Sequence, residues 1–119
     1  MSVAPVTVKL GGTTIVDQQD VLREIVEERA TRPVVVVHGG GKRLTEWLER
    51  LGVESQWNQG RRVTDEATLE VFLAVIGGVI NAELTEALLA LGAKAVGARA
   101  VSYTHLRAHE TGSGISYAV

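Results

Sequence analysis

Apolar residues recur along this chain at two spacings, which predict strands and helices in alternation. They occupy every second position of the segment 6–10, as expected for a strand. The segment 34–37 consists of four valines, which predicts a strand buried on both faces. Further strands are expected at 93–97 and, as a short segment, near Arg62.

Helical spacing of apolar residues fills the intervals between these strands. It predicts helices over about 18–30, 42–51, 65–76 and 81–91. Strands that alternate with helices in this way are typical of α/β proteins. We therefore predict a three-layer α-β-α sandwich with a mainly parallel central sheet, truncated at its C-terminal side.

The expected helix at 65–76 has a recognisable start. Thr64 or Asp65 can serve as its N-cap, because each carries a side-chain oxygen that can accept from a free N–H of the first turn. Its apolar positions repeat at helical spacing and are Leu69, Phe72, Leu73 and Ile76.

The valine strand ends abruptly in His38-Gly39-Gly40-Gly41, and a helix follows. Without Cβ atoms the backbone can approach a ligand closely and adopt positive φ, so N–H groups can converge on phosphate or carboxylate oxygens. Two chemistries use such a turn: the phosphoryl and carboxylate cradle of amino-acid kinases, and the oxyanion hole of esterases. A tight turn that binds no ligand is the third interpretation.

The first strand also runs into glycines, Gly11 and Gly12, and Lys9 lies just before them. A fixed positive charge beside two sets of convergent amides suits phosphoryl transfer, because the transition state spreads negative charge over the phosphoryl oxygens. A lysine on an edge strand can equally serve solubility alone. The pairing with two glycine turns favours the catalytic interpretation.

A third polar segment, Asn58-Gln59-Gly60-Arg61-Arg62-Val63-Thr64-Asp65, precedes the 65–76 helix. Arginine can grip a carboxylate through two parallel hydrogen bonds, so one of its two arginines is a candidate substrate clamp. The alternative is a solvated arginine that balances Asp65 and Glu66.

In this order and spacing, the motifs at 9–12, 38–41 and 58–65 resemble the N-terminal half of the acetylglutamate kinases, a branch of the amino-acid kinase family. The match continues through Asn81-Ala82-Glu83-Leu84 and Lys94-Ala95-Val96-Gly97, so that it covers about residues 5–97. One departure is Thr45, which stands where an asparagine is often seen. The resemblance implies phosphorylation of the side-chain carboxylate of N-acetyl-L-glutamate, with ATP and Mg²⁺ as co-substrate and no bound prosthetic group.

The resemblance also implies residue roles. Lys9 would stabilise the transferring phosphoryl group, and Arg62, which directly precedes Val63-Thr64-Asp65, would bind the substrate's α-carboxylate. Glycines would supply the remaining contacts: Gly40 and Gly41 to the substrate carboxylate, and Gly11, Gly12 and Gly39 to phosphate. Glutamate 5-kinase, aspartokinase and the lysine-pathway homologue are competing members of the family, but the segment from Gly60 to Asp65 favours the acetylglutamate enzymes.

The amino-acid composition limits the classes of partner that we expect this protein to bind. A net charge of −2 does not indicate the excess of basic residues that is typical of nucleic-acid-binding proteins. The absence of cysteine excludes disulfides and cysteine-based sites. No apolar stretch is expected to be long enough to span a bilayer, and the short lead before the first strand is expected to leave no room for a signal peptide. We therefore expect a cytoplasmic protein without nucleic-acid or membrane partners.

From about Ala98 the sequence leaves the family pattern. Both tyrosines and two of the three histidines lie in the final seventeen residues. The tract resembles a translated sequencing adaptor, so we predict that residues 1–97 are the substrate-binding part of an amino-acid kinase domain and residues 98–119 are an artefactual or non-family tail. His105, His109 and Glu110 lack the order of a zinc protease motif, and no metal site is expected.

A chain that stops here would lack the ATP-binding half of such an enzyme. The fragment itself is therefore expected to be inactive, and the full-length protein is expected to form a homodimer. Two other classes stay open. An esterase would use His38–Gly41 as its oxyanion hole, although Gly112-Ser113-Gly114 lacks the flanking glycines of a nucleophile elbow. A non-catalytic ligand-binding or dimerisation module of the same fold is the other.

Overall fold

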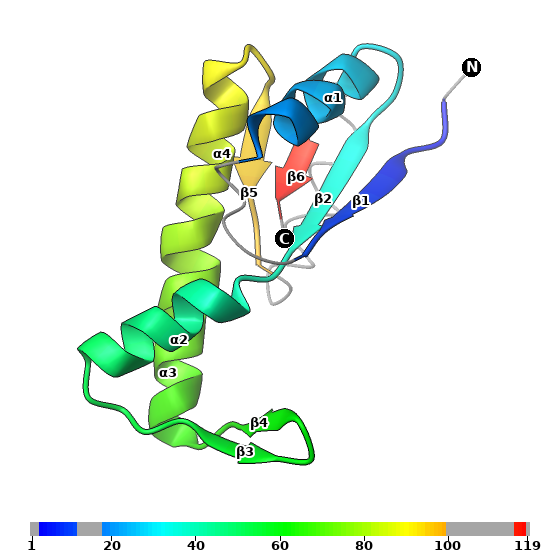
Figure 1. The fold of residues 1–119 in the computed structure, drawn as a ribbon. Helices are drawn as coiled ribbons and strands as arrows, with labels where there is room; N and C mark the ends of the chain where they lie inside the picture. Colours follow the sequence, from blue (N-terminus) through cyan, green and yellow to red (C-terminus); the bar gives the residue numbers. More distant parts are fainter. Residues whose placement is uncertain (1–2, 12–17, 100–115, 119) are drawn as a thin grey trace.

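The computed structural model describes residues 3–11, 18–99 and 116–118 (Figure 1). Its elements in chain order are β1 (Val6–Leu10), α1 (Gln19–Arg29), β2 (Val34–His38), α2 (Gly41–Arg50), β3 (Gln56–Asn58), β4 (Arg61–Val63), α3 (Glu66–Ala74), the π-helical η2 (Val75–Ile80), α4 (Asn81–Ala90), β5 (Ala95–Gly97) and β6 (Ser116–Ala118). The strands and helices expected from the sequence up to residue 97 are present within a few residues of their predicted bounds.

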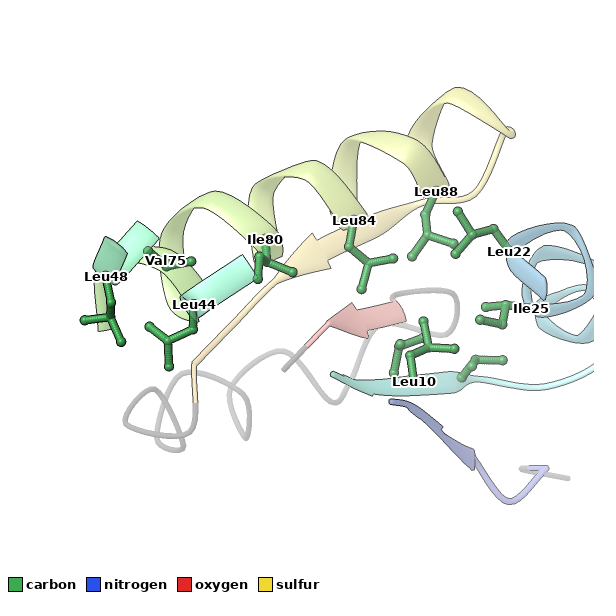
Figure 2. Packing of buried hydrophobic residues seen from close by; sticks show 11 residues of the cluster. Leu10, Leu22, Ile25, Leu44, Leu48, Val75, Ile80, Leu84 and Leu88 are labelled. Atoms are coloured by element: carbon green, nitrogen blue, oxygen red, sulfur yellow. The ribbon is translucent and has the colours of Figure 1, made fainter. Parts of the chain in front are cut away.

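The main sheet has the strand order β1-β2-β6-β5, and all three pairings are parallel. This arrangement confirms the predicted α/β class with a mainly parallel sheet. The described helices α1 and α4 direct their apolar side chains to the same face of it (Figure 2). Two of the three expected layers are therefore seen in the part of the chain that the structure describes.

The burial of β2 corrects one expectation. Val34 and Val36 are fully buried, but Val37, on the opposite face, is 36% exposed. In the part of the chain that the structure describes, the run of valines therefore forms a strand that is covered on one face rather than on both. In the β1–β2 register Leu10 lies opposite His38, so the even-numbered residues of both strands share the covered face.

The core is formed by leucines and valines from every layer. Leu22 of α1 and Leu84 and Leu88 of α4 meet above the sheet, and each is essentially inaccessible to solvent (Figure 2). Burial of one such side chain stabilises a fold by roughly 1.5–3 kcal/mol. Leu44 and Leu48 of α2 extend the same cluster toward Val75 and Ile80.

The sequence predicted two separate helices at 65–76 and 81–91, but α3, η2 and α4 form one continuous helix, Glu66–Ala90. Gly77 and Gly78 do not break it, because the chain passes them with π-helical turns, a local widening that inserts residues without ending the helix.

This continuous helix is 25 residues long, and an 18-residue stretch of it has a mean hydropathy of 1.6, so by length and composition alone it could cross a bilayer. A helix of this length was not predicted, because the sequence indicated two shorter helices. A core helix passes the same test, and this helix buries Val75, Ile80, Leu84 and Leu88 in the core.

Three large apolar side chains of α3 do not face the core, contrary to what is usual for a helix of a globular protein. Leu69, Phe72 and Leu73 are each more than 40% exposed, whereas Thr68 is 1% exposed. An apolar strip on α3 therefore faces away from the core. We call Leu69, Phe72 and Leu73 the α3 strip.

β6 lies between β2 and β5 in the sheet, with Val36 opposite Ala118 and Ala95 opposite Ser116. His105, His109 and Glu110, on which a metal interpretation of the tail would depend, lie outside the described residues. The assignment of residues 98–119 to a non-family tail stays a prediction.

Candidate functional site

Gly39, Gly40 and Gly41, which we call the glycine turn, connect β2 to α2 (Figure 1). They lie at the carboxyl edge of the parallel sheet, which is the usual ligand side of α/β folds. Gly40 has φ 147° and ψ 35°, a conformation that side chains disfavour. A Cβ on Gly40 would lie 2.2 Å from Cδ1 of Ile80 and 3.0 Å from Cδ1 of Ile76. Glycine is thus required at position 40 by its backbone and by the helix packed beneath it, whereas Cβ atoms at Gly39 and Gly41 would meet open space.

The start of α2 is electropositive. Its first intrahelical hydrogen bond runs from Leu44 N–H to Gly40 C=O over 2.9 Å, so the N–H groups of Gly41, Lys42 and Arg43 have no acceptor within the helix. The first turn contains no acidic residue. The helix dipole and the basic side chains add in sign here, which favours an anion.

Arg43 is already paired. Its guanidinium donates to both carboxylate oxygens of Glu83 on α4, over 2.8 and 3.0 Å. That hydrogen bond raises the pKa of Arg43, against the opposing effect of desolvation. Arg43 therefore ties α2 to the long helix.

Behind the turn, His38 and Asn81 form a buried polar contact. Asn81 Nδ2 lies 3.0 Å from His38 Nε2, and His38 Nδ1 lies 3.0 Å from the Gly39 carbonyl oxygen. Because the amide nitrogen can only donate, Nε2 accepts and Nδ1–H donates to Gly39. The Gly39 carbonyl is thereby held toward the imidazole. In a trans peptide the N–H of Gly40 then points the opposite way, away from His38.

The β3–β4 hairpin presents the two candidate arginines differently. Gln59 and Gly60 have φ 49° and 75°, the two positive values of a tight two-residue turn that fixes the register. In that register Arg62 lies opposite Trp57 and Arg61 lies opposite Asn58. Since neighbouring residues of a strand point to opposite faces, only one arginine can face α2. Arg62 is half-buried and Arg61 is exposed.

Three neutral groups hold the guanidinium of Arg62. Nη1 donates to Ser55 Oγ and Nη2 to Thr45 Oγ1, each over 2.6 Å, and the guanidinium carbon lies 4.6 Å from the Trp57 ring centroid. Among the described residues no carboxylate pairs with Arg62. Its charge is therefore oriented but not neutralised, which suits an anionic ligand.

Thr45 connects this arginine to the glycine turn. Its hydroxyl donates to the Gly41 carbonyl over 2.9 Å while it accepts from Arg62. The two features that the sequence nominated separately, the glycine turn and one arginine, are therefore brought together in space.

The residues that the sequence predicted to contact phosphate are described only in part. Lys9 is exposed and lies opposite Val37 in the register, on the uncovered face of the sheet. Gly11 has open space where a Cβ would be, and Gly12 lies outside the described residues. Lys9 is thus near the carboxyl edge of the sheet, one strand away from the glycine turn.

An open depression of about 510 Å³ lies on the hairpin and is lined by Asn58, Gln59, Arg61, Arg62 and Val63. It includes both arginines but not the glycine turn. Within the described ranges no group of three or more His, Asp or Glu side chains could hold a metal ion. The serine at 113 that an esterase would need lies outside the described residues.

Sequence reasoning missed the residues that orient this site. Ser55 carries no pattern that marks it, and Asn81 stood out only as a motif member. The contact of Trp57 with Arg62 follows from the two-residue turn, so recognising the turn type would have predicted it. Thr45 stood out only as a departure from the usual asparagine.

This chain is similar in sequence to amino acid kinases. The model of the amino acid kinase family matches residues 5–114. Acetylglutamate kinase from Dehalococcoides mccartyi is 37% identical over 113 residues, covering 90% of this chain and 41% of that enzyme. The acetylglutamate kinase of Syntrophomonas wolfei is 39% identical over 115 residues, with 92% and 40% covered. The matched family range runs beyond residue 97, and the boundary at residue 98 stays a prediction.

Solved structures show the same fold at low identity. The smu.665 protein of Streptococcus mutans superposes with a TM-score of 0.77 at 19% identity, covering 96% of this chain and 58% of that one. Isopentenyl phosphate kinase gives a TM-score of 0.56 at 17% identity, covering 97% and 56%. The chain spans about two fifths of the length of the curated relatives it matches.

Proposed function

The chain belongs to the amino acid kinase family, and we propose that it carries the substrate-binding part of an enzyme that phosphorylates the side-chain carboxylate of N-acetyl-L-glutamate. The observation that carries the proposal is the guanidinium of Arg62, held in place by neutral partners and linked through Thr45 to the glycine turn. The curated relatives named acetylglutamate kinase support the same substrate.

The substrate has an anionic group at each end, and the site offers two matching positions. Arg62 binds the α-carboxylate through guanidinium N–H groups other than those donated to Ser55 and Thr45. The N–H groups of Gly40 and Gly41 hold the side-chain carboxylate at the electropositive start of α2.

The proposed reaction transfers the γ-phosphoryl group of ATP, with Mg²⁺, to that carboxylate. An oxygen of the carboxylate attacks phosphorus while the bond to the β-phosphate oxygen breaks, so ADP leaves and an acyl phosphate forms. Lys9 and the amides of Gly11, Gly12 and Gly39 stabilise the negative charge that develops on the transferring group. The nucleotide pocket is proposed to lie in the part of the relatives that this chain does not span. The 119-residue chain is therefore proposed to bind the amino-acid substrate without turning it over.

A chimeric enzyme tests the reaction. Residues 1–97 of this chain, joined to the remaining part of the Syntrophomonas wolfei acetylglutamate kinase, should phosphorylate N-acetyl-L-glutamate in an ATP-dependent assay of acyl phosphate. In this chimera Lys9→Ala should lower kcat far more than it raises KM, because its contact is stronger in the transition state. Arg62→Lys should raise KM for N-acetyl-L-glutamate and leave KM for ATP nearly unchanged, since a point charge cannot replace a planar fork.

Arg61→Lys is the matched control, because Arg61 is the exposed neighbour on the other face of the hairpin. It should leave both KM values nearly unchanged. A folded chimera that prefers L-glutamate would favour glutamate 5-kinase. Equal effects of the two arginine substitutions would contradict the assignment of Arg62.

The full-length protein is proposed to be a cytoplasmic homodimer. The α3 strip supports the homodimer, because three large apolar side chains are exposed together on one helix and offer a surface that a second copy would cover. Phe72→Glu should lower the mass of the chimera in sedimentation analysis from dimer to monomer. A monomeric unsubstituted chimera would contradict the proposal.

A further inference from the structure

We infer that Thr45 is a positioning residue that sets the distance between Arg62 and the glycine turn, and thereby selects the length of the dicarboxylate bound between them. The inference rests on the proposed function, which assigns the two ends of the substrate to Arg62 and to the N–H groups of Gly40 and Gly41.

The hydroxyl of Thr45 has a fixed direction of hydrogen bonding. Its single proton goes to the Gly41 carbonyl over 2.9 Å, so its lone pairs receive Nη2–H of Arg62 over 2.6 Å. A guanidinium can only donate, so the two contacts cannot be reversed. The result is a directed chain from the arginine through one hydroxyl to the turn.

The other two partners of Arg62 do not fix it relative to α2. Ser55 immediately precedes β3, and Trp57 lies within β3, so both belong to the hairpin side of the site. They keep the guanidinium on the hairpin. Within the described residues, Thr45 provides the hydrogen bond that ties Arg62 to α2.

This tie matters because the two anion positions lie on different elements. Arg62 is on β4, whereas the amides of the glycine turn lead into α2. If the hairpin shifts against α2, the separation between the two positions changes. A ligand one methylene shorter or longer then meets only one of them well. Thr45 therefore favours the glutamate length over the aspartate length.

The experiment compares Thr45→Val with Thr45→Ser in the 119-residue chain. Valine keeps the shape of threonine and removes the hydroxyl, whereas serine keeps the hydroxyl. The first readout needs no ligand: the 15N–1H NMR signals of the Arg62 side chain report whether the guanidinium rotates freely. The second readout is the pair of dissociation constants for N-acetyl-L-glutamate and N-acetyl-L-aspartate. Backbone amide spectra confirm that each variant is folded.

We expect slow guanidinium rotation in the unsubstituted chain and in Thr45→Ser, and faster rotation in Thr45→Val, in which Ser55 and Trp57 alone hold the guanidinium. Thr45→Val should weaken binding of N-acetyl-L-glutamate roughly tenfold, because part of the free energy of the lost hydrogen bond to a charged group no longer holds Arg62 at the required distance. It should change binding of N-acetyl-L-aspartate little, so the preference for the longer ligand falls.

Two results would overturn the inference, provided that N-acetyl-L-glutamate still binds. In the first, the guanidinium of Thr45→Val rotates as slowly as in the unsubstituted chain. In the second, it rotates faster but the preference for N-acetyl-L-glutamate over N-acetyl-L-aspartate is unchanged. If the unsubstituted folded chain binds neither ligand, the proposed function fails instead, and the selection of length fails with it.

Discussion

Replacement of Gly40 by alanine is the substitution for which the structure predicts the most specific effect. Gly40 has φ 147°, and the space for a Cβ is occupied by Cδ1 of Ile80, 2.2 Å away. The substitution therefore has two separable costs, one in the backbone and one in packing.

The two costs can be sized from general values. A non-glycine residue in a sparsely populated backbone conformation costs roughly 1–3 kcal/mol. A methyl group forced into filled space costs roughly 1–3 kcal/mol more. Gly40→Ala should therefore lower the free energy of unfolding by about 2–6 kcal/mol. That is a large share of the roughly 5–15 kcal/mol that a domain has.

Ile80→Val separates the two costs, because it removes the Cδ1 atom that the new methyl would meet. Alone it should cost about 0.5–1.5 kcal/mol. Combined with Gly40→Ala it should recover part of the packing cost, so the double substitution is less destabilising than the sum of the single ones by about 1 kcal/mol. The backbone cost should remain.

Urea unfolding followed by the fluorescence of Trp47 and Trp57 measures these differences, provided that the slope with denaturant is unchanged. Gly41→Ala is the matched control, because its Cβ would meet open space. The reasoning is refuted if Gly40→Ala is no more destabilising than Gly41→Ala. Strict additivity with Ile80→Val would refute the packing part alone.

Two further predictions concern the N-cap of the long helix and a buried polar contact made by it. Asp65 caps α3, because its carboxylate accepts a hydrogen bond from Thr68 N–H over 2.8 Å. The hydrogen bonds from Thr68 lower the pKa of the Asp65 carboxyl. The cap therefore stabilises the fold above the unfolded-state pKa, and this stabilisation is lost as the pH falls through the folded-state pKa. Asp65→Ala should lower Tm at pH 7, and the difference should shrink in acid; a difference independent of pH would contradict this. Asn81→Ala should cost about 1–3 kcal/mol in chemical denaturation, because it leaves the buried Nε2 of His38 without its donor. In the unsubstituted chain, 15N NMR should find the neutral imidazole proton on Nδ1, and a proton on Nε2 would contradict the described contact.

Much of the fold followed from local patterns. The period of two in β1, the valine run of β2 and the helical spacing of α2 each depend on neighbouring residues, so sequence alone located them. The continuous helix across Gly77 and Gly78 did not follow, because local propensity disfavours glycine there while tertiary packing of Val75 and Ile80 sustains the helix.

The candidate site was predictable only in part, for a similar reason. The glycine turn and Arg62 were nominated from motif positions, and residue chemistry supports both. Their connection through Thr45 depends on how the hairpin lies against α2, a contact between residues 17 positions apart. The exposure of the α3 strip likewise depends on which face of the helix meets the core.

Binding of N-acetyl-L-glutamate to the 119-residue chain tests the central claim most directly. In a titration followed by 15N NMR without nucleotide, the amides of Gly40 and Gly41 and the side chain of Arg62 should shift together and saturate with one dissociation constant. Arg62→Lys should abolish the shared saturation, whereas Arg61→Lys should preserve it. Absence of saturable shifts at the glycine amides and Arg62 in the folded chain, or their equal loss in both variants, would contradict the account.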